Sequence, residues 1–337
     1  MQDDPIVITG AARTPMGSFQ GSLTGLKAPE LGAAAIAAAI ERSGSAPDSV
    51  DEVLMGCVLP AGQRQAPARQ AALGAGLPLA IPCTTINKMC GSGMKAAMLG
   101  HDIIRAGAAR VTVTGGLESM SNAPYLLPKA RAGYRLGNGE LLDHMFVDGL
   151  EDAYEPGKLM GHYAEDCAER YGFSRKDQDD FAIESLTRAK EATDSGAFRD
   201  EITPVSIVGR KETVTVEFDE QPLNANIEKI PHLKPAFRKD GTVTPANSSS
   251  ISDGGAALVM MRLSDAEKGG HVPLARILGH ASFANEPGLF TTAPVFAMRK
   301  LLDSVDWSVD SVDLFEVNEA FAVVAMAAMR DLAIPHE

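Results

Sequence analysis

Cysteine is scarce in this sequence, and the spacing of the cysteines excludes two common uses of the residue. None of them forms a Cys-x-x-Cys pair, so neither a zinc site nor a disulfide framework is indicated. The four cysteines are Cys57, Cys83, Cys90 and Cys167. We therefore expect no bound metal and no disulfide.

Long apolar runs are also missing. The longest, residues 31–40, is ten residues of mostly alanine, which is well short of a membrane span. The opening residues, MQDDPIVITG, lead straight into a strand pattern and lack the basic and apolar regions of a signal peptide. We therefore expect a cytoplasmic protein with no membrane partner.

Basic residues are outnumbered by acidic ones, 31 to 44, which gives a formal net charge of −13. Such a balance argues against a general affinity for nucleic acid or for anionic membranes, so we expect no nucleic-acid partner. Any anionic ligand must be held by local features.

What the sequence does contain is an alternation of short β-branched runs with alanine-rich helical stretches. With 337 residues and 45% hydrophobic residues, the chain can bury one large core or two smaller ones. The alternation indicates crossover connections and a largely parallel sheet. A later run, GGAALVMMRL at 254–263, resumes the buried-strand pattern and is expected to rejoin this sheet. The expected strands are residues 6–10, 52–56, 84–87 and 111–116, and the expected helices are residues 30–43 and 94–106.

The alternation breaks at residue 119. Residues 119–248 are more polar and richer in proline and glycine, and we interpret them as an inserted loop domain. They contain an amphipathic helix that begins at a capping box starting with Ser174 and ends at Gly196. A short echo, DSVDEVLMGCV at 48–58 and DSVDLFEVNEA at 310–320, indicates an internal duplication.

Cys90 is the candidate nucleophile. It stands where an irregular loop becomes a helix, and a helix N-terminus supplies partial positive charge and unpaired amides that favour a thiolate. Gly91 and Gly93 remove side chains, so that the backbone can turn sharply and a substrate can approach. From these features alone, a buried structural cysteine explains the pattern equally well.

The segment around Cys90 also resembles the nucleophile segment of the thiolases. The resemblance covers nearly the whole chain in the family's order of motifs, and this favours a catalytic over a structural cysteine. The matching segments are IVITGAARTPMG at 6–17, NKMCGSGMKA at 87–96, GGLESMS at 115–121, MGHYAEDCAERYGFSRKDQDDFA at 160–182, TVTPANSSSISDGGAA at 242–257 and VNEAFA at 317–322.

The resemblance implies a role for each matched residue. Cys90 would take the acyl group as a thioester, and Asn318, in the NEAF motif, would hold a water that forms an oxyanion hole. Ser249 would contact the pantetheine arm of coenzyme A, although its NSSS segment departs from the family's NASG. The residues that would line the acyl and pantetheine tunnel, or else be plain core, are Met160, Phe237, Phe290 and Phe321.

A departure from the family concerns the adenosine phosphates. Related enzymes often carry an arginine near these phosphates, where this chain has Leu223. Other basic residues are candidates for phosphate contacts, although charged loop residues are usually just solvated surface. The candidates are Arg210, Lys211, Arg238 and Lys239, together with the cluster Lys129, Arg131 and Arg135.

The largest departure is at the C-terminal end. Thiolases carry a histidine in a GHP motif, which activates the nucleophile, and a second cysteine, which removes the α-proton of acetyl-CoA. Neither motif occurs among these 337 residues. Together with the internal echo, this predicts a chain that lacks about 55–60 C-terminal residues of a longer enzyme and is inactive and poorly soluble without them.

These observations predict an α/β protein with the thiolase fold. The expected architecture has two duplicated βαβαβαββ halves in a five-layer α-β-α-β-α arrangement, with an inserted loop domain and an incomplete second half. Residues 1–118 with 249–270 would form the N-terminal half, residues 119–248 the loop domain, and residues 271–337 the C-terminal half.

The implied activity is that of an acyltransferase. It would condense two acyl-CoA molecules to a 3-ketoacyl-CoA, or cleave that product by thiolysis, through an acyl-cysteine on Cys90. Acyl-CoA and coenzyme A would be its ligands, with no metal or redox cofactor, and a homodimer or homotetramer is expected. Two alternatives stay open: a non-catalytic thiolase-like binding or scaffold subunit, and a ketoacyl synthase-type condensing enzyme, against which the NEAF and GGLESMS segments argue.

Overall fold

A computed structural model describes residues 4–209 and 211–336 of the chain. The chain divides into two compact units, and each is described by itself. Unit 1 comprises Met1–Gly149, Thr193–Leu223 and Ile251–Ile277, and unit 2 comprises Leu150–Ala192, Asn224–Ser250 and Leu278–Glu337. Because these units follow packing within the chain, they do not test the expected division into two halves and a loop domain, which stays a prediction.

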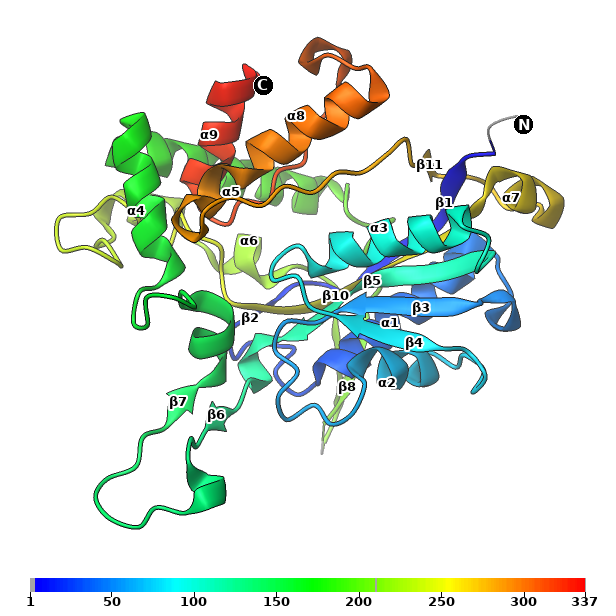
Figure 1. Ribbon diagram of the computed structural model, residues 1–337, viewed down its shortest axis with the longest axis horizontal. Helices are drawn as coiled ribbons and strands as arrows, with labels where there is room; N and C mark the ends of the chain where they lie inside the picture. Colours follow the sequence, from blue (N-terminus) through cyan, green and yellow to red (C-terminus); the bar gives the residue numbers. More distant parts are fainter. Residues whose placement is uncertain (1–3, 210, 337) are drawn as a thin grey trace. The chain divides into compact units, whose positions relative to one another are not determined.

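Unit 1 is built on one mixed sheet (Figure 1). The expected strands all form, and toward one edge of the sheet β3 pairs in parallel with both β4 and β5. The run at 254–263 does rejoin the sheet, as β10, but it lies antiparallel to both β1 and β5. In order, the strands are β11 (Ala275–Arg276), β1 (Ile6–Arg13), β10 (Ser252–Arg262), β5 (Val111–Ser119), β3 (Glu52–Gly56) and β4 (Cys83–Ile86), and β2 (Gly17–Ser18) also pairs with β10.

The antiparallel β10 corrects the expectation of a largely parallel sheet. β3, β4 and β5 follow one another through short helical crossovers, and a crossover brings each strand back in the same direction. Residues 120–251 separate β5 from β10, and they do not form a single helical crossover. No crossover therefore sets the direction of β10. It fills the gap between β1 and β5 over nine residue pairs with β5, Asp253 with Ser119 through Met261 with Val111.

Helices cover both faces of this sheet. α1 (Ala28–Ser43) and α2 (Pro67–Gly74) lie on one face, and α3 (Ser92–Arg105) lies on the other (Figure 1). α1 begins where the Glu30 carboxylate accepts from the Lys27 amide at 2.8 Å, and it ends at Gly44, whose φ of +68° stops the helix. A short α7 (Leu263–Gly269) follows β10. The largest core cluster between sheet and helices includes Ile36, Val53, Met55, Val113 and Val259.

The remaining segments of unit 1 are two small hairpins. β6 (Tyr125–Leu126) pairs with β7 (Leu142–Asp143) at the base of an extended arm, and β8 (Val205–Val208) pairs with β9 (Thr213–Val216). A buried carboxylate fixes a loop near the second hairpin: Asp219 accepts two bonds from the Arg13 guanidinium, at 2.7 and 2.9 Å, and one from the Met16 amide at 2.8 Å. α6 (Glu220–Asn224) follows directly.

Unit 2 is helical. Its helices are α4 (Met160–Tyr171), α5 (Arg175–Ser195), α8 (Ala293–Val305) and α9 (Ala322–Leu332). α5 confirms the predicted capping box, because the Ser174 amide donates to Asp177 at 2.8 Å and the Asp177 amide donates to the Ser174 hydroxyl at 3.2 Å. Over the part of the chain that the structure describes, no helix is both long and apolar enough to cross a membrane.

The second copy of the internal echo does not form a strand. Val309–Ser311 is a 3-10 turn, and residues 312–320 form neither helix nor strand before α9. Within the described residues, unit 2 has isolated bridges, such as Ser248 with Phe321, but no strand ladder. A strand needs a neighbour to satisfy its backbone groups, and Leu314 is accordingly 89% exposed rather than packed in a sheet.

Candidate active site

Three loops meet at one edge of the unit 1 sheet. β3, β4 and β5 are parallel neighbours, so their carboxyl ends lie together, and in open α/β sheets such an edge is where ligands bind. The loop after β3 carries Cys57, the loop after β4 carries Cys90, and β5 carries Glu118 near its end. Two of these three side chains were not predicted as site residues.

The turn that carries Cys90 is held by side chains on both sides of it. Ser92 is buried, and its hydroxyl donates to the Met89 carbonyl at 2.5 Å and accepts from the Lys88 amide at 2.8 Å. On the other side, the Asn87 side-chain oxygen accepts from the Met89 amide at 3.0 Å. The Cys90 thiol is exposed, two residues before the first residue of α3. The geometry therefore presents this thiol to solvent at a helix start, as the sequence predicts.

The prediction that the glycines make the sharp turn is wrong, while their effect on substrate approach stays a prediction. The left-handed backbone is at Met89, with φ of +48°, whereas Gly91 has φ of −86°. A Cβ on Gly93 would meet nothing nearer than 3.6 Å, which is ordinary contact. The close approach is at Gly56, the last residue of β3, where a Cβ would lie 2.6 Å from Ser92 Cβ and 2.7 Å from Gly93 N. The sequence signal that could have found Gly56 is the glycine that ends the apolar strand EVLMG.

Burial distinguishes Cys90 from the other three thiols. Burial, and secondarily the negative charge of Glu118, raises the pKa of Cys57 to about 12. Burial also raises the pKa of Cys83 and of Cys167. These three thiols therefore stay protonated at neutral pH, and Cys90 is the exposed thiol of the four.

Glu118 is a site residue that sequence reasoning missed, although it lies in the GGLESMS segment. Its carboxylate accepts from the Val58 amide at 2.7 Å and from the Leu59 amide at 3.1 Å, and the Cys57 sulfur lies 3.5 Å from it. Burial raises the pKa of this carboxyl. The available signal was a glutamate in a strand that carries no other charged residue.

The four expected tunnel residues lie together in unit 2. Met160, Phe237, Phe290 and Phe321 all belong to one apolar cluster with α4 and α9 side chains. Phe321 is at its centre: its ring centroid lies 6.0 Å from that of Phe237 and 6.5 Å from that of Phe290. The ring of Phe237 lies so close to Gly161 that a Cβ there would come within 2.3 Å of it. The four residues therefore share one apolar cluster, and their role as a tunnel lining stays a prediction.

Ser249 and Asn318 lie on two segments that contact each other in unit 2. The Ser249 hydroxyl donates to the Glu319 carbonyl at 2.5 Å, and its amide donates to the Ala320 carbonyl at 3.0 Å. The Ala320 amide in turn donates to the Asn318 carbonyl at 2.8 Å. The Ser249 hydroxyl is therefore engaged by the NEAF segment itself, while the Asn318 residue is exposed.

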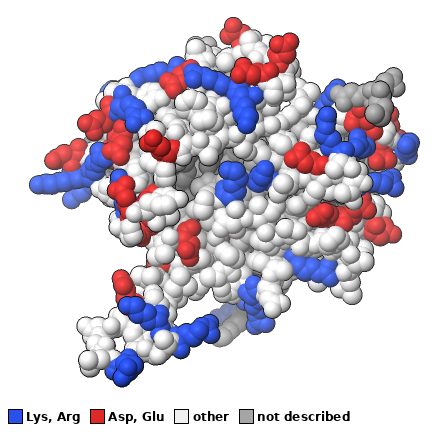
Figure 2. Space-filling view, viewed as in Figure 1, with Lys and Arg blue, Asp and Glu red and all other residues white. Residues whose placement is uncertain are grey.

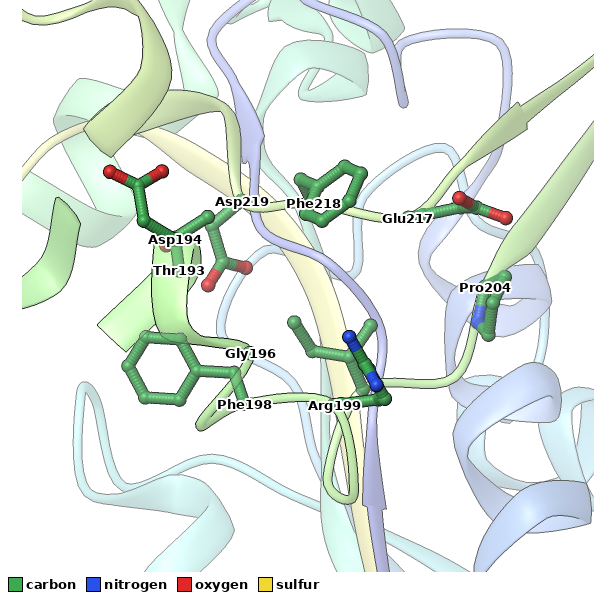
Figure 3. A pocket seen from close by; sticks show the side chains of 10 residues that line it. Thr193, Asp194, Gly196, Phe198, Arg199, Pro204, Glu217, Phe218 and Asp219 are labelled. Atoms are coloured by element: carbon green, nitrogen blue, oxygen red, sulfur yellow. The ribbon is translucent and has the colours of Figure 1, made fainter. Parts of the chain in front are cut away.

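Two cavities within the described residues are lined by none of the predicted residues. One in unit 1, of about 580 Å³, is lined by aromatic and charged side chains that include Phe198, Arg199, Glu217, Phe218 and Asp219 (Figure 3). Another in unit 2, of about 360 Å³, lies between α4 and the Pro287–Thr292 turn.

The basic residues proposed for phosphate contacts are dispersed. Lys129, Arg131 and Arg135 are exposed on the arm beyond β6 and β7, where blue side chains gather in Figure 2. Arg238 pairs with Asp166 on α4, so its charge is partly neutralised. Lys211 and Lys239 are exposed, and Arg210 lies outside the described residues.

Comparison with known proteins gives one consistent answer. Residues 6–264 match the thiolase N-terminal domain, and residues 271–337 match the thiolase C-terminal domain. An "Acetyl-CoA acetyltransferase" of Pseudomonas aeruginosa is 49% identical over 334 residues, which are 98% of this chain and 84% of the relative. The "Acetyl-CoA acetyltransferase A, mitochondrial" of Xenopus laevis is 47% identical over 332 residues, 98% of this chain and 78% of the relative.

A solved structure agrees with these matches. The crystal structure of the Bacillus anthracis acetyl-CoA acetyltransferase is 40% identical and superimposes with a TM-score of 0.96, covering 99% of this chain and 84% of that chain. Because both domain models together cover nearly all of the sequence, the chain belongs to the thiolase family and has the thiolase fold.

Proposed function

We propose that this protein transfers acyl groups between coenzyme A and Cys90, and so condenses two acyl-CoA molecules to a 3-ketoacyl-CoA or cleaves that product. The observation that carries the proposal is the exposed Cys90 thiol at the start of α3 in a chain of the thiolase family. The names of the relatives support acetyl-CoA as the acyl donor.

The first half-reaction takes place between the Cys90 thiol and the thioester of an acyl-CoA. The Cys90 thiolate attacks the thioester carbonyl carbon, the bond from that carbon to the sulfur of coenzyme A breaks, and the departing coenzyme A thiolate takes up a proton. The partial positive charge at the start of α3 favours the attacking anion. In the second half-reaction, a second acyl-CoA loses an α-proton and its α-carbon bonds to the acyl carbon, while the bond from that carbon to the Cys90 sulfur breaks. The released Cys90 thiolate takes up the proton, which restores the thiol.

Residues of unit 2 complete the proposal. Asn318 would hold a water that donates to the developing oxyanion. Met160, Phe237, Phe290 and Phe321 would provide apolar surface for the acyl and pantetheine groups, which their shared cluster supports. Ser249 would contact the pantetheine arm through a group other than its hydroxyl hydrogen, because that hydrogen is already donated to Glu319.

The proposed reaction uses coenzyme A thioesters and side chains of this chain. A homodimer or homotetramer and a cytoplasmic location stay predictions, and relatives include bacterial proteins as well as one named mitochondrial.

Isotope exchange tests the first half-reaction by itself. The protein is incubated with acetyl-CoA and labelled coenzyme A, and the appearance of label in acetyl-CoA is followed. We expect exchange that is lost in Cys90→Ala and kept in the matched control Cys83→Ala. Exchange that persists in Cys90→Ala would refute the assignment, and binding of coenzyme A without any exchange would favour the non-catalytic binding subunit.

A further inference from the structure

Glu118 is a partly buried carboxylate that the proposed reaction does not use. We infer that Glu118 and Asn87 are positioning residues for Cys90: together they connect the ends of β5, β3 and β4 and hold the backbone that precedes the nucleophile. The inference rests on the proposed function only in taking Cys90 as the reacting thiol.

The first link joins β5 to the loop after β3. Both carboxylate oxygens of Glu118 are used, one for the Val58 amide at 2.7 Å and the other for the Leu59 amide at 3.1 Å. Two consecutive amides bound to one carboxylate fix the direction of the peptide chain between them. The Val58 carbonyl is thereby directed away from Glu118, toward the loop that follows β4.

The second link joins that loop to the Cys90 turn. The Asn87 side-chain nitrogen donates to the Val58 carbonyl at 3.3 Å, while its side-chain oxygen accepts from the Met89 amide at 3.0 Å. One amide side chain therefore bridges two loops. Met89 is the residue with φ of +48°, a conformation that a non-glycine residue keeps only when its surroundings hold it there.

The third link comes from the helix side. Ser92 bonds to Lys88 and Met89, and Gly56 lets the start of α3 lie directly against the end of β3. Ser92 alone closes the turn but does not tie it to the rest of the sheet edge. The Asn87 bridge does so, and Glu118 sets the position of the group to which Asn87 binds. Neither residue is expected to touch the substrate, so both act through Cys90.

The test compares Asn87→Ala and Glu118→Gln with a matched control. Asn87 is exposed, so its loss should not unfold the protein, and Glu118→Gln keeps one acceptor oxygen. Asn122→Ala is the control, because Asn122 also bridges backbone groups of unit 1, the Thr24 and Leu26 carbonyls at 2.9 and 3.0 Å, and has no bond to the Cys90 turn. Asn87→Asp separates the two halves of the bridge, since it keeps the acceptor for Met89 and loses the donor to Val58.

Two readouts are used, and one of them does not depend on activity. We expect Asn87→Ala and Glu118→Gln to slow iodoacetamide labelling of Cys90 at neutral pH and to lower kcat of acetyl-CoA exchange by about tenfold or more, with KM for acetyl-CoA unchanged. Asn87→Asp should lie between Asn87→Ala and the unaltered protein. The control Asn122→Ala should lower the melting temperature without changing either rate.

The inference is overturned if Cys90 labelling in Asn87→Ala and Glu118→Gln is as fast as in the unaltered protein, or if Asn122→Ala slows it equally. The proposed function can fail separately: an unaltered protein without exchange activity would contradict acyl transfer. The labelling rates would then still decide whether Asn87 and Glu118 position the thiol.

Discussion

Cys57 and Cys90 show how the surroundings of a thiol decide its chemistry. They follow neighbouring parallel strands, yet Cys57 is 1% exposed beside the Glu118 carboxylate, while Cys90 is exposed at the start of α3. Burial and the nearby negative charge both disfavour a Cys57 thiolate. The residue type is the same, and its position at the edge of the sheet determines whether it can react.

This contrast predicts the order in which the cysteines are alkylated. A brief iodoacetamide treatment of the folded protein should label Cys90 well before Cys57, Cys83 and Cys167, because the last three are buried or partly buried with raised pKa values. Peptide mass mapping measures the order, and labelling in denaturant provides the control in which all four react. Preferential labelling of any other cysteine in the folded protein would contradict the nucleophile assignment.

A second prediction for a single residue concerns Asn318. Asn318→Ala removes the proposed holder of the oxyanion water and should lower turnover by roughly 10²-fold or more, the usual scale for losing such a donor. Asn285→Ala is a suitable control, because Asn285 lies in the same unit and its side chain accepts from the amide of its own neighbour, Glu286, at 2.9 Å. Near-normal turnover of Asn318→Ala in a steady-state assay would remove Asn318 from the mechanism.

At the scale of elements, the start of α3 depends on the end of β3. Gly56 has no side chain, so the first turn of α3 packs directly on the strand, and this contact sets where the Cys90 turn begins. Further along α3, the lack of a side chain at Gly100 lets the helix pack directly on β5. A Cβ there would lie 2.5 Å from Thr114 Cγ2. The helix is therefore held close to the sheet at its start and again beyond its middle.

Gly56→Ala should separate these two elements. The added methyl would overlap Ser92 Cβ at 2.6 Å, so we expect a loss of about 1–3 kcal/mol in the free energy of unfolding, with slower exchange on Cys90. Gly254→Ala is the matched control, because Gly254 lies in β10 of the same sheet and an added Cβ would come no closer than 3.4 Å to Thr14 Oγ1. Denaturant melts measure both variants, and equal stability of the two would show that the close approach has no cost.

The elements could be predicted where local pattern decides them. The alternation of β-branched and alanine-rich runs predicted β1, β3, β4, β5, α1 and α3, and a capping box predicted the start of α5. The direction of β10 could not be predicted, because it depends on where residues 120–251 bring the chain back to the sheet. The echo at 310–320 suggested a strand like that at 52–56, and the segment does not form one. A strand-like sequence forms no ladder without a neighbouring strand.

The candidate site was predictable only in part. The motif around Cys90 and the family resemblance identified the thiol and the Met160 and Phe321 cluster. Asn87, Glu118 and Gly56 were missed as site residues because their roles depend on contacts between loops far apart in sequence. A sequence shows that a glutamate is the one charged residue of a strand, but it does not show which amides that glutamate binds.

At the scale of the whole molecule, groups in both units link stability to alkaline pH. Cys57 in unit 1 has its pKa raised to about 12, chiefly by burial, and Tyr171 in unit 2 has its pKa raised to about 12 by burial and by its bond to Asp331. Each group keeps its proton in the folded state at a pH where the unfolded chain has lost it. Their contribution is therefore complete below the ordinary pKa values and is lost as the pH rises toward about 12.

Thermal melting against pH checks this linkage. The melting temperature should fall as the pH rises above the ordinary thiol pKa of 9.0, because the unfolded state then binds fewer protons than the folded state. Cys57→Ser removes one of the linked protons and should make this fall shallower, and Tyr171→Phe should do the same. An unchanged slope in Cys57→Ser would mean that the buried thiol does not contribute.

The most direct test of acyl transfer on Cys90 is to find the acyl group there. The protein is mixed with acetyl-CoA, quenched with acid and digested, and the peptides are mapped by mass. We predict one acetyl group on the peptide that contains Cys90, removable by hydroxylamine as a thioester and absent in Cys90→Ala. An acetyl group on another residue, or no acetyl-enzyme under conditions where labelled coenzyme A exchanges into acetyl-CoA, would contradict the account.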